Sequence, residues 1–249
     1  MEVAPVPPLM RSPTLIAAFV FFALRVAAAP LPPKTRVYLT GDGQVVPRTT
    51  LVFLHGLSSR PGDPLIKRLV IQIRQQKQNY RVVAPWLRPV LKERQQIYRA
   101  GPHTMPDQLR RATQVINQIP GRVFLVGHSF GGSAAVELAR LMPEKVKGVV
   151  GLGAAFHMLK SYWRQQPQPL RQLAQQVKTP TLLIHGTRDG VCPVGGALAF
   201  AQYNGGGKVC VKQLPGADHR FGADHPGPAS DKTFAQIAQE LVRFVRKND

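Results

Sequence analysis

The stretch of sequence that decides the fold is Val123-Phe-Leu-Val-Gly127-His128-Ser129-Phe130-Gly131-Gly132-Ser133-Ala-Ala. Its opening apolar run has the length of a buried strand, and an Ala-rich run suited to a helix begins just after Ser129. Between the two lies Gly-x-Ser-x-Gly. A serine on such a sharp strand-to-helix turn is held in strained backbone geometry, and its hydroxyl projects above the edge of the sheet. The flanking glycines are required because side chains there would hold the strand and the helix apart.

Gly-x-Ser-x-Gly alone is a weak signal, since glycine and serine also meet in loops that have no chemistry. Here the strand predicted before it and the helix predicted after it supply the context that the motif requires. The helix would also direct its first free N–H groups toward the space above Ser129, where an oxyanion would form. We therefore interpret the stretch as a turn that carries a nucleophile, and not as a Gly/Ser turn between two buried elements.

Two further residues with suitable chemistry follow later strands of the predicted sheet. The buried apolar run at residues 181–186 leads to Asp189, and the run at residues 208–214 leads to His219. The alternating polarity of the second run predicts a strand near the edge of the sheet. Open α/β sheets place their sites at the carboxyl ends of the strands, where all three residues stand. A histidine there can accept the proton of Ser129, and a carboxylate can orient and stabilise that histidine.

With these features the chain resembles the α/β-hydrolases over residues 36–247. The resemblance implies an α/β fold with a mostly parallel central sheet, helices on both faces and a short cap, and the alternation of strands and helices favours the same sheet. It also implies a catalytic triad of Ser129, Asp189 and His219, because Ser, Asp, His is the family's order along the chain. The family further implies two backbone N–H donors for the oxyanion, those of Leu57 and Phe130.

Several residues compete for these roles. Asp218 adjoins His219 and is the rival acid, although a sequence neighbour on a tight loop usually points elsewhere. His225, in a Gly/Pro-rich loop, is the rival base. Asp189 has a structural alternative as an Asx-turn or the N-cap of the helix that follows. For His55 we favour a structural role, bonded to nearby backbone.

The remaining pattern predicts the other elements. Strands are expected at residues 36–40, 44–46, 50–55, 80–86 and 146–153, the first two forming a hairpin. One helix should begin after the N-cap Asp63 and run to about Gln78, and another should occupy residues 107–119. Apolar residues at helical spacing predict an amphipathic closing helix, and they are Phe234, Ile237, Ala238, Leu241 and Val245.

The segment at residues 154–178 is where the family inserts its cap, and its shortness predicts an open pocket. Tyr162 and Trp163 either line a substrate site or anchor the cap on the core, and the sequence favours neither. The candidate substrate-binding residues lie in the cap and in the loop near Trp86 and Leu87, and they are Trp86, Phe156, Leu159, Tyr162 and Trp163.

The first 29 residues do not resemble the rest of the fold. Arg11 precedes an apolar run at residues 14–24, which is short for a membrane span and fits the apolar region of a secretory signal. We expect residues 1–29 to be a signal peptide or a membrane anchor, with an organellar transit peptide or an upstream extension as alternatives. The acid and prolines of residues 2–8 weaken the signal interpretation. Residues 30–35 read as a stiff linker to a domain at residues 36–249.

The net charge is +20, from 33 Lys and Arg against 13 Asp and Glu. Such an excess predicts attraction to anionic surfaces, including a membrane. The basic residues are scattered and accompany no nucleic-acid-binding motif, so we expect no specific nucleic-acid partner. Two cysteines, Cys192 and Cys210, are too few for a disulfide framework, and whether they pair is left open.

The sequence therefore predicts a serine hydrolase that cleaves carboxylic esters or thioesters of small molecules or lipids through an acyl-enzyme intermediate. No cofactor is implied, and the scattered histidines give no metal-ligand spacing. An export or membrane-anchored location follows if the leader is a signal or an anchor. The alternative function is a non-catalytic binding protein on the same scaffold, held at an anionic surface. The acyl length and the oligomeric state are not determined.

Overall fold

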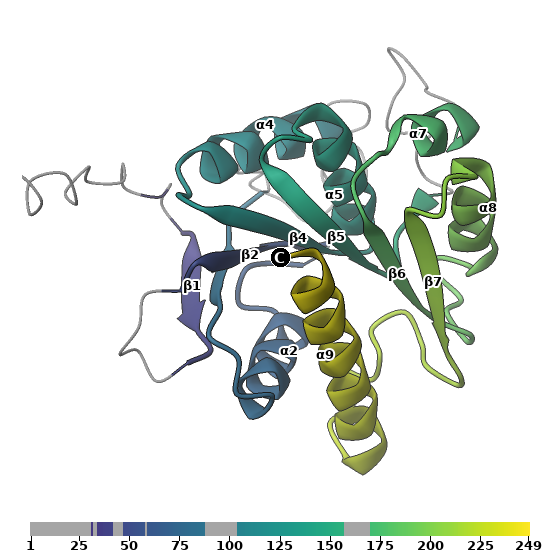
Figure 1. The fold of residues 1–249 in the computed structure, drawn as a ribbon. Helices are drawn as coiled ribbons and strands as arrows, with labels where there is room; N and C mark the ends of the chain where they lie inside the picture. The colour runs from purple at the N-terminus through teal and green to yellow at the C-terminus, as the bar shows by residue number, and fades with distance from the viewer. Residues whose placement is uncertain (1–30, 32–33, 42–46, 58, 88–103, 157–169) are drawn as a thin grey trace, which may run out of the picture. The chain divides into compact units, whose positions relative to one another are not determined.

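The computed structural model describes residue 31 and residues 34–41, 47–57, 59–87, 104–156 and 170–249. Its core is a seven-stranded sheet with the order β1-β3-β2-β4-β5-β6-β7 (Figure 1). The strands are β1 (Arg36–Leu39), β2 (Thr49–Leu54), β3 (Arg81–Ala84), β4 (Arg122–His128), β5 (Val146–Leu152), β6 (Thr181–Gly186) and β7 (Val209–Leu214). The helices are α2 (Pro64–Gln75), α4 (Thr104–Asn117), α5 (Phe130–Leu141), α7 (Leu170–Gln176), α8 (Gly195–Asn204) and α9 (Pro228–Asn248).

The sheet is parallel from β3 through β7, and only β1 runs antiparallel, beside β3. Central strands β2, β4, β5 and β6 are buried along almost their whole length, as parallel strands covered on both faces must be. The carboxyl ends of β4, β6 and β7 therefore meet at one edge of the sheet. The loops that carry Ser129, Asp189 and His219 leave the sheet at that edge.

Alternate residues of each strand feed two separate cores. In β4, Leu125 belongs to the core shared with α4, α5, α7 and α8, whereas Phe124 and Val126 belong to the core shared with α2 and α9. Figure 1 shows these two sets of helices on opposite sides of the sheet. This arrangement confirms the predicted α/β fold with helices on both faces.

Most predicted elements are present, with shifted ends. Helix α2 begins after Asp63, whose side chain accepts the Leu65 N–H at 2.9 Å, so the predicted N-cap is confirmed. Strand β7 lies at the sheet edge, as its alternation predicts. The predicted start of the next helix at residue 107 was wrong, because α4 already begins at Thr104 and includes Pro106. Proline is tolerated there since first-turn N–H groups have no partner within the helix.

The predicted hairpin is only partly described. Strand β1 pairs with β3, with Arg36 opposite Ala84, and its proposed partner at residues 44–46 lies outside the described residues. The leader at residues 1–29 and the cap residues Leu159, Tyr162 and Trp163 also lie outside them. Within the described ranges, no helix combines the length and the apolar character needed to cross a bilayer. Cys192 is buried, Cys210 is exposed, and neither forms a disulfide.

Candidate active site

The turn between β4 and α5 is possible only because two of its residues lack a side chain. A Cβ at Gly127 would lie 2.2 Å from the Gly131 carbonyl oxygen, and a Cβ at Gly131 would lie 2.1 Å from the Leu54 carbonyl oxygen. Both separations are far inside van der Waals contact, and both involve backbone atoms that cannot move aside. The steric requirement predicted from the sequence is confirmed at both positions.

Ser129 has the strained backbone expected of a residue on this turn. Its φ is 56° and its ψ is −122°, a region that residues with side chains rarely adopt. The strain is sustained by hydrogen bonds on both sides, because the Ser129 N–H donates to the Leu152 carbonyl at 2.9 Å and the Ser129 carbonyl accepts from Gly132 and Ala155. The backbone of β5 and its following loop thus fixes the position of the serine.

Asp189 and His219 lie side by side at the ends of β6 and β7. The His219 Nδ1–H donates to Asp189 Oδ2 at 2.8 Å, which leaves Nε2 as the basic nitrogen. Close packing at Gly153 brings the two side chains together, since a Cβ there would lie 3.1 Å from Asp189 Oδ2 and 3.3 Å from His219 Nδ1. The pair has the geometry of an oriented general base.

The Asp189 carboxylate is buried and strongly hydrogen-bonded. Its Oδ1 accepts the backbone N–H groups of Val191 and Cys192, and Oδ2 also lies 3.3 Å from His185 Nε2. Burial alone would raise the pKa of Asp189, but the bonds from His185, His219 and Cys192 outweigh it and lower the pKa below its usual value. Asp189 therefore forms an Asx-turn, the structural role named for it from the sequence, and it also holds the His219 imidazole.

Cys192 lies between the acid and the serine. Its thiol is within hydrogen-bonding reach of the Ser129 hydroxyl, and burial, aided by the Asp189 charge, raises its pKa to about 12. The sulfur is therefore protonated at neutral pH and is not a nucleophile. Among the described residues no hydrogen bond joins the Ser129 hydroxyl to His219, and such bonds often form only once substrate is present.

His128, the residue before the serine, supports the His219 loop. Its Nε2–H donates to the His219 carbonyl at 3.0 Å, and the two ring centroids are 4.9 Å apart. Burial, followed by the proximity of His219, lowers the pKa of His128 to about 4. A neutral His128 adds no positive charge beside the base, so it does not oppose formation of an imidazolium at His219.

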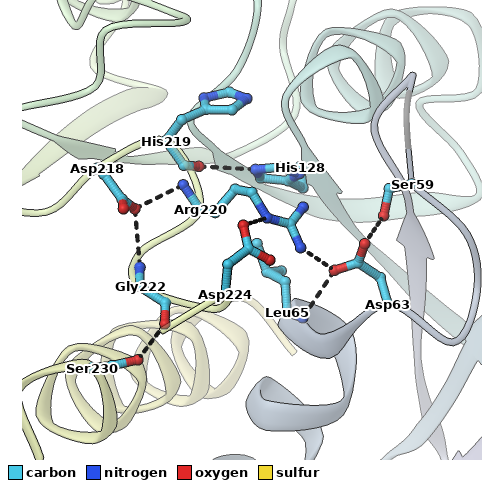
Figure 2. Close-up of polar contacts among 10 residues, drawn as sticks. All are labelled: Ser59, Asp63, Leu65, His128, Asp218, His219, Arg220, Gly222, Asp224 and Ser230. Atoms are coloured by element: carbon cyan, nitrogen blue, oxygen red, sulfur yellow. Dashed lines mark hydrogen bonds and ion pairs between the residues drawn. The ribbon is translucent and has the colours of Figure 1, made fainter. Parts of the chain in front are cut away.

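A second set of contacts holds the same loop from the other side. Figure 2 shows the Arg220 guanidinium between the carboxylates of Asp63 and Asp224, at 2.9 and 2.5 Å. Asp63 also accepts the Ser59 hydroxyl, which ties the loop after β2 to the loop after β7. Arginine held between two carboxylates fixes the backbone directly after His219.

The loop after β2 approaches the serine closely. A Cβ at Gly56 would lie 3.2 Å from Ser129 Cβ, so glycine permits this approach and brings Leu57, its neighbour, to the site. His55 has the structural role predicted for it, because its Nδ1–H donates to the Gly56 carbonyl at 2.9 Å and its Nε2 accepts the Leu87 N–H at 3.2 Å. Phe130, the other predicted oxyanion residue, begins α5 directly after Ser129.

The rivals named from the sequence have other partners. Asp218 Oδ1 accepts the N–H groups of Arg220 and Gly222, so it closes a turn (Figure 2). His225 is exposed on the loop before α9. Of the predicted substrate residues, Phe156 is buried and stacks on Phe200 with ring centroids 4.5 Å apart, a packing contact that gives no support to a substrate role. Trp86 is half-buried beside His55.

Sequence reasoning missed the residues that hold the base in place. His185, His128 and Arg220 carry no signal by type or spacing, and Asp63 signals only a helix N-cap, because their partners in the site are distant in the chain. The one available hint is that the histidines stand at strand ends next to predicted site residues. Among the described residues, no group of three His, Cys, Asp or Glu side chains is arranged to hold a metal ion.

Comparisons with known proteins agree with this architecture. A family model described as an alpha/beta hydrolase domain matches residues 47–247. A comparison with curated protein sequences finds no significant match.

Similar solved structures include Est1E from Butyrivibrio proteoclasticus, with a TM-score of 0.67, 13% identity, and coverage of 85% of this chain and 94% of that one. A serine hydrolase involved in carbazole degradation has a TM-score of 0.60 at 17% identity, covering 85% and 94%. The Paleococcus ferrophilus monoacylglycerol lipase has a TM-score of 0.59 at 16% identity, covering 84% and 99%. At these identities the likeness concerns the fold.

Proposed function

The chain belongs to the alpha/beta hydrolase domain family, whose model spans residues 47–247, and from this premise we propose that it is a serine hydrolase that cleaves ester or thioester bonds. The observation that carries the proposal is the oriented base, in which the His219 Nδ1–H donates to Asp189 at 2.8 Å beside the strained turn of Ser129. An orienting carboxylate, a histidine with a basic Nε2 and a serine on a sharp turn are together the components of acyl transfer.

In the proposed reaction His219 Nε2 accepts the proton of Ser129 as the hydroxyl oxygen attacks the substrate carbonyl carbon. The imidazolium is stabilised by Asp189, whose lowered pKa keeps it ionised throughout. His219 then returns the proton to the leaving oxygen or sulfur, and an acyl-enzyme remains on Ser129. Water, deprotonated by the same nitrogen, attacks the acyl carbon and releases the carboxylic acid and the free serine.

For the oxyanion we propose the backbone N–H groups of Leu57 and Phe130. Two glycines bring their turns together, because a Cβ at Gly56 would lie 3.2 Å from Ser129 Cβ and a Cβ at Gly131 would lie 2.1 Å from the Leu54 carbonyl oxygen. Donors of this kind are worth about 3–4 kcal/mol each in the transition state of comparable enzymes. The direction of the first helical N–H groups of α5 supports the second donor.

The test is covalent labelling of the purified full-length chain with a fluorophosphonate probe. We expect wild type to label, Ser129→Ala not to label, and wild type to hydrolyse at least one p-nitrophenyl ester between acetate and dodecanoate. Ser133→Ala is the matched control, because Ser133 lies in the same helix and its hydroxyl has no partner among the described residues. It should label like wild type.

Folded wild type that neither labels nor hydrolyses any ester of the series would contradict the proposal. The alternative function, a non-catalytic binding protein on the same scaffold, would then be the better interpretation. Export or membrane anchoring through residues 1–29, and association with anionic surfaces through the basic charge, stay predictions.

A further inference from the structure

A basic pocket lies beside the candidate active site and has no role in the proposed triad. Its volume is about 480 Å³, and its walls contribute four cations together with Thr35 and Trp86. The cations are Lys34, Arg36, Arg60 and Lys67. We call this cavity the basic pocket. No carboxylate side chain is among the described residues that line it.

The cations of the basic pocket have no acidic partner within the described part of the chain, where none of the four forms an ion pair. The nearest acid along this loop is Asp63, and its oxygens already accept Ser59, the Leu65 N–H and Arg220. Four like charges gathered in a concave site repel one another and concentrate positive potential there. The arrangement is favourable when an anion occupies it.

Two wall residues also hold polar atoms without partners. Trp86 Nε1 and Thr35 Oγ1 are buried, and neither has a hydrogen-bond partner among the described residues. Buried donors are normally satisfied, so each such atom requires an explanation. An indole N–H can only donate, so Trp86 Nε1 needs an acceptor that the described residues do not supply.

Two of the four cations contact the walls of the pocket. Lys34 Nζ lies 5.5 Å from the centre of the Trp86 ring, a cation–π contact. The Arg36 guanidinium lies against Gly62, where a Cβ would come within 3.2 Å of Arg36 Cζ. Gly62, in the loop after β2, therefore leaves room for the Arg36 guanidinium. These contacts are independent of the triad.

The basic pocket opens on the same edge of the sheet as Ser129. Arg36 pairs with Ala84 at the carboxyl end of β3, and Trp86 follows two residues later. In the sheet order, only β2 separates β3 from β4, the strand that leads to Ser129. Strands lie about 4.8 Å apart, so β3 and β4 are on the order of 10 Å apart. Trp86 also contacts His55, whose neighbour Gly56 lies against Ser129.

We propose that the basic pocket binds a carboxylate or phosphate group of the substrate whose ester reacts at Ser129. The substrate would then be an anionic ester whose charged group reaches across the two to three strand spacings, about 10–14 Å, that separate β3 and β1 from β4. The catalytic part of this inference rests on the proposed hydrolase function, whereas anion binding by the pocket does not.

The first experiment measures binding without catalysis. The chain has two tryptophans, so Trp163→Phe leaves Trp86 as the single reporter, and Ser129→Ala prevents turnover. Inorganic phosphate and glutarate are titrated at constant ionic strength, followed by Trp86 fluorescence and by calorimetry. We expect saturable binding that weakens about tenfold or more in Arg36→Ala and in Lys67→Ala, as the loss of a charge-assisted contact predicts.

Lys208→Ala is the matched control, since it removes the same charge beside the amino end of β7, at the opposite edge of the sheet. Circular dichroism verifies the fold of each variant. Absence of phosphate and glutarate binding by the parent protein would overturn the proposal. Equal binding by Arg36→Ala, Lys67→Ala and Lys208→Ala would also overturn it.

The second experiment compares two esters of equal chain length, p-nitrophenyl octanoate and p-nitrophenyl hydrogen octanedioate. We expect kcat/KM for the anionic ester, divided by that for the neutral ester, to fall about tenfold or more in Arg36→Ala/Lys67→Ala. Lys208→Ala should leave the ratio unchanged. An unchanged ratio in the double variant would overturn the substrate assignment. Anion binding without hydrolysis of either ester would support the pocket and count against the proposed function alone.

Discussion

The two halves of the candidate site are held in place by different physics. The nucleophile turn, residues 127–132, is fixed by contacts between backbone atoms and by the absence of side chains at Gly127 and Gly131. The base loop, residues 215–224, is fixed by polar side chains from distant parts of the chain. His128 is 91 residues from His219, and Asp63 is 157 residues from Arg220.

This difference determines what each half can tolerate. In the nucleophile turn an added Cβ would overlap with backbone atoms, so substitutions of its glycines act on folding. A loop held by hydrogen bonds can keep its place when one partner changes, so substitutions there act on charge, tautomer and orientation. Substitutions in the nucleophile turn should therefore lower the stability of the fold, whereas substitutions that affect the base loop should lower catalytic activity.

The largest effect should come from Asp189, the carboxylate after β6 that orients the histidine of the base loop. Asp189→Asn keeps the size of the side chain but removes the charge that orients and stabilises the His219 imidazolium, and we expect kcat to fall about 10³- to 10⁴-fold. The measurement is hydrolysis of the best ester substrate at neutral pH. The matched control is Asp218→Asn, whose side-chain oxygen can still accept from Arg220 and Gly222 and should change kcat by less than about threefold. Equal losses in both variants would contradict the assignment of the acid.

The nucleophile turn should show the next largest effect, on stability. Gly131→Ala would place a Cβ 2.1 Å from the Leu54 carbonyl oxygen, and we expect the free energy of unfolding to fall by about 3 kcal/mol or more. Urea denaturation measures this loss. Gly195→Ala is the matched control, because nothing lies within 4 Å of a Cβ there, and it should change stability by less than about 1 kcal/mol. A fully stable Gly131→Ala would show that the turn can open.

The smallest effect should be a pH dependence that His128 gives to the base loop. Because burial lowers its folded pKa to about 4 from the usual 6.5, the unfolded chain binds more protons between these values, and stability falls as the pH is lowered. From pH 7 to pH 4.5 this histidine should contribute a loss of about 2–3 kcal/mol. His128→Gln retains a side-chain donor and should lose that contribution, as measured by urea denaturation at both pH values.

The matched control is His225→Gln, which makes the same substitution at a histidine exposed on the loop before α9. If His128→Gln and wild type lost equal stability between pH 7 and pH 4.5, then His128 would not be the buried neutral group described here, and another group would have to account for the slope.

Local sequence was sufficient to predict the fold class and the three residues of the proposed triad. The strand, the turn glycines and the following helix are consecutive, so the constraint that shapes them can be read from neighbouring residues. The N-cap Asp63 and the edge position of β7 could be predicted for the same reason. The start of α4 could not be placed correctly from Pro106, because proline is compatible both with a break and with a first turn.

Only the tertiary structure decided which groups support the base and where unpaired charge gathers. The cations of the basic pocket belong to β1, the segment just before it, the loop after β2 and α2. In the sequence they are indistinguishable from the other basic residues of a chain with net charge +20. Arg220 likewise meets Asp63 only because α2 and the loop after β7 lie at the same edge of the sheet. The physical reason is the separation along the chain of the residues that interact. Steric limits on a turn act between adjacent residues, whereas ion pairs and hydrogen bonds depend on which distant segments the folded sheet brings together.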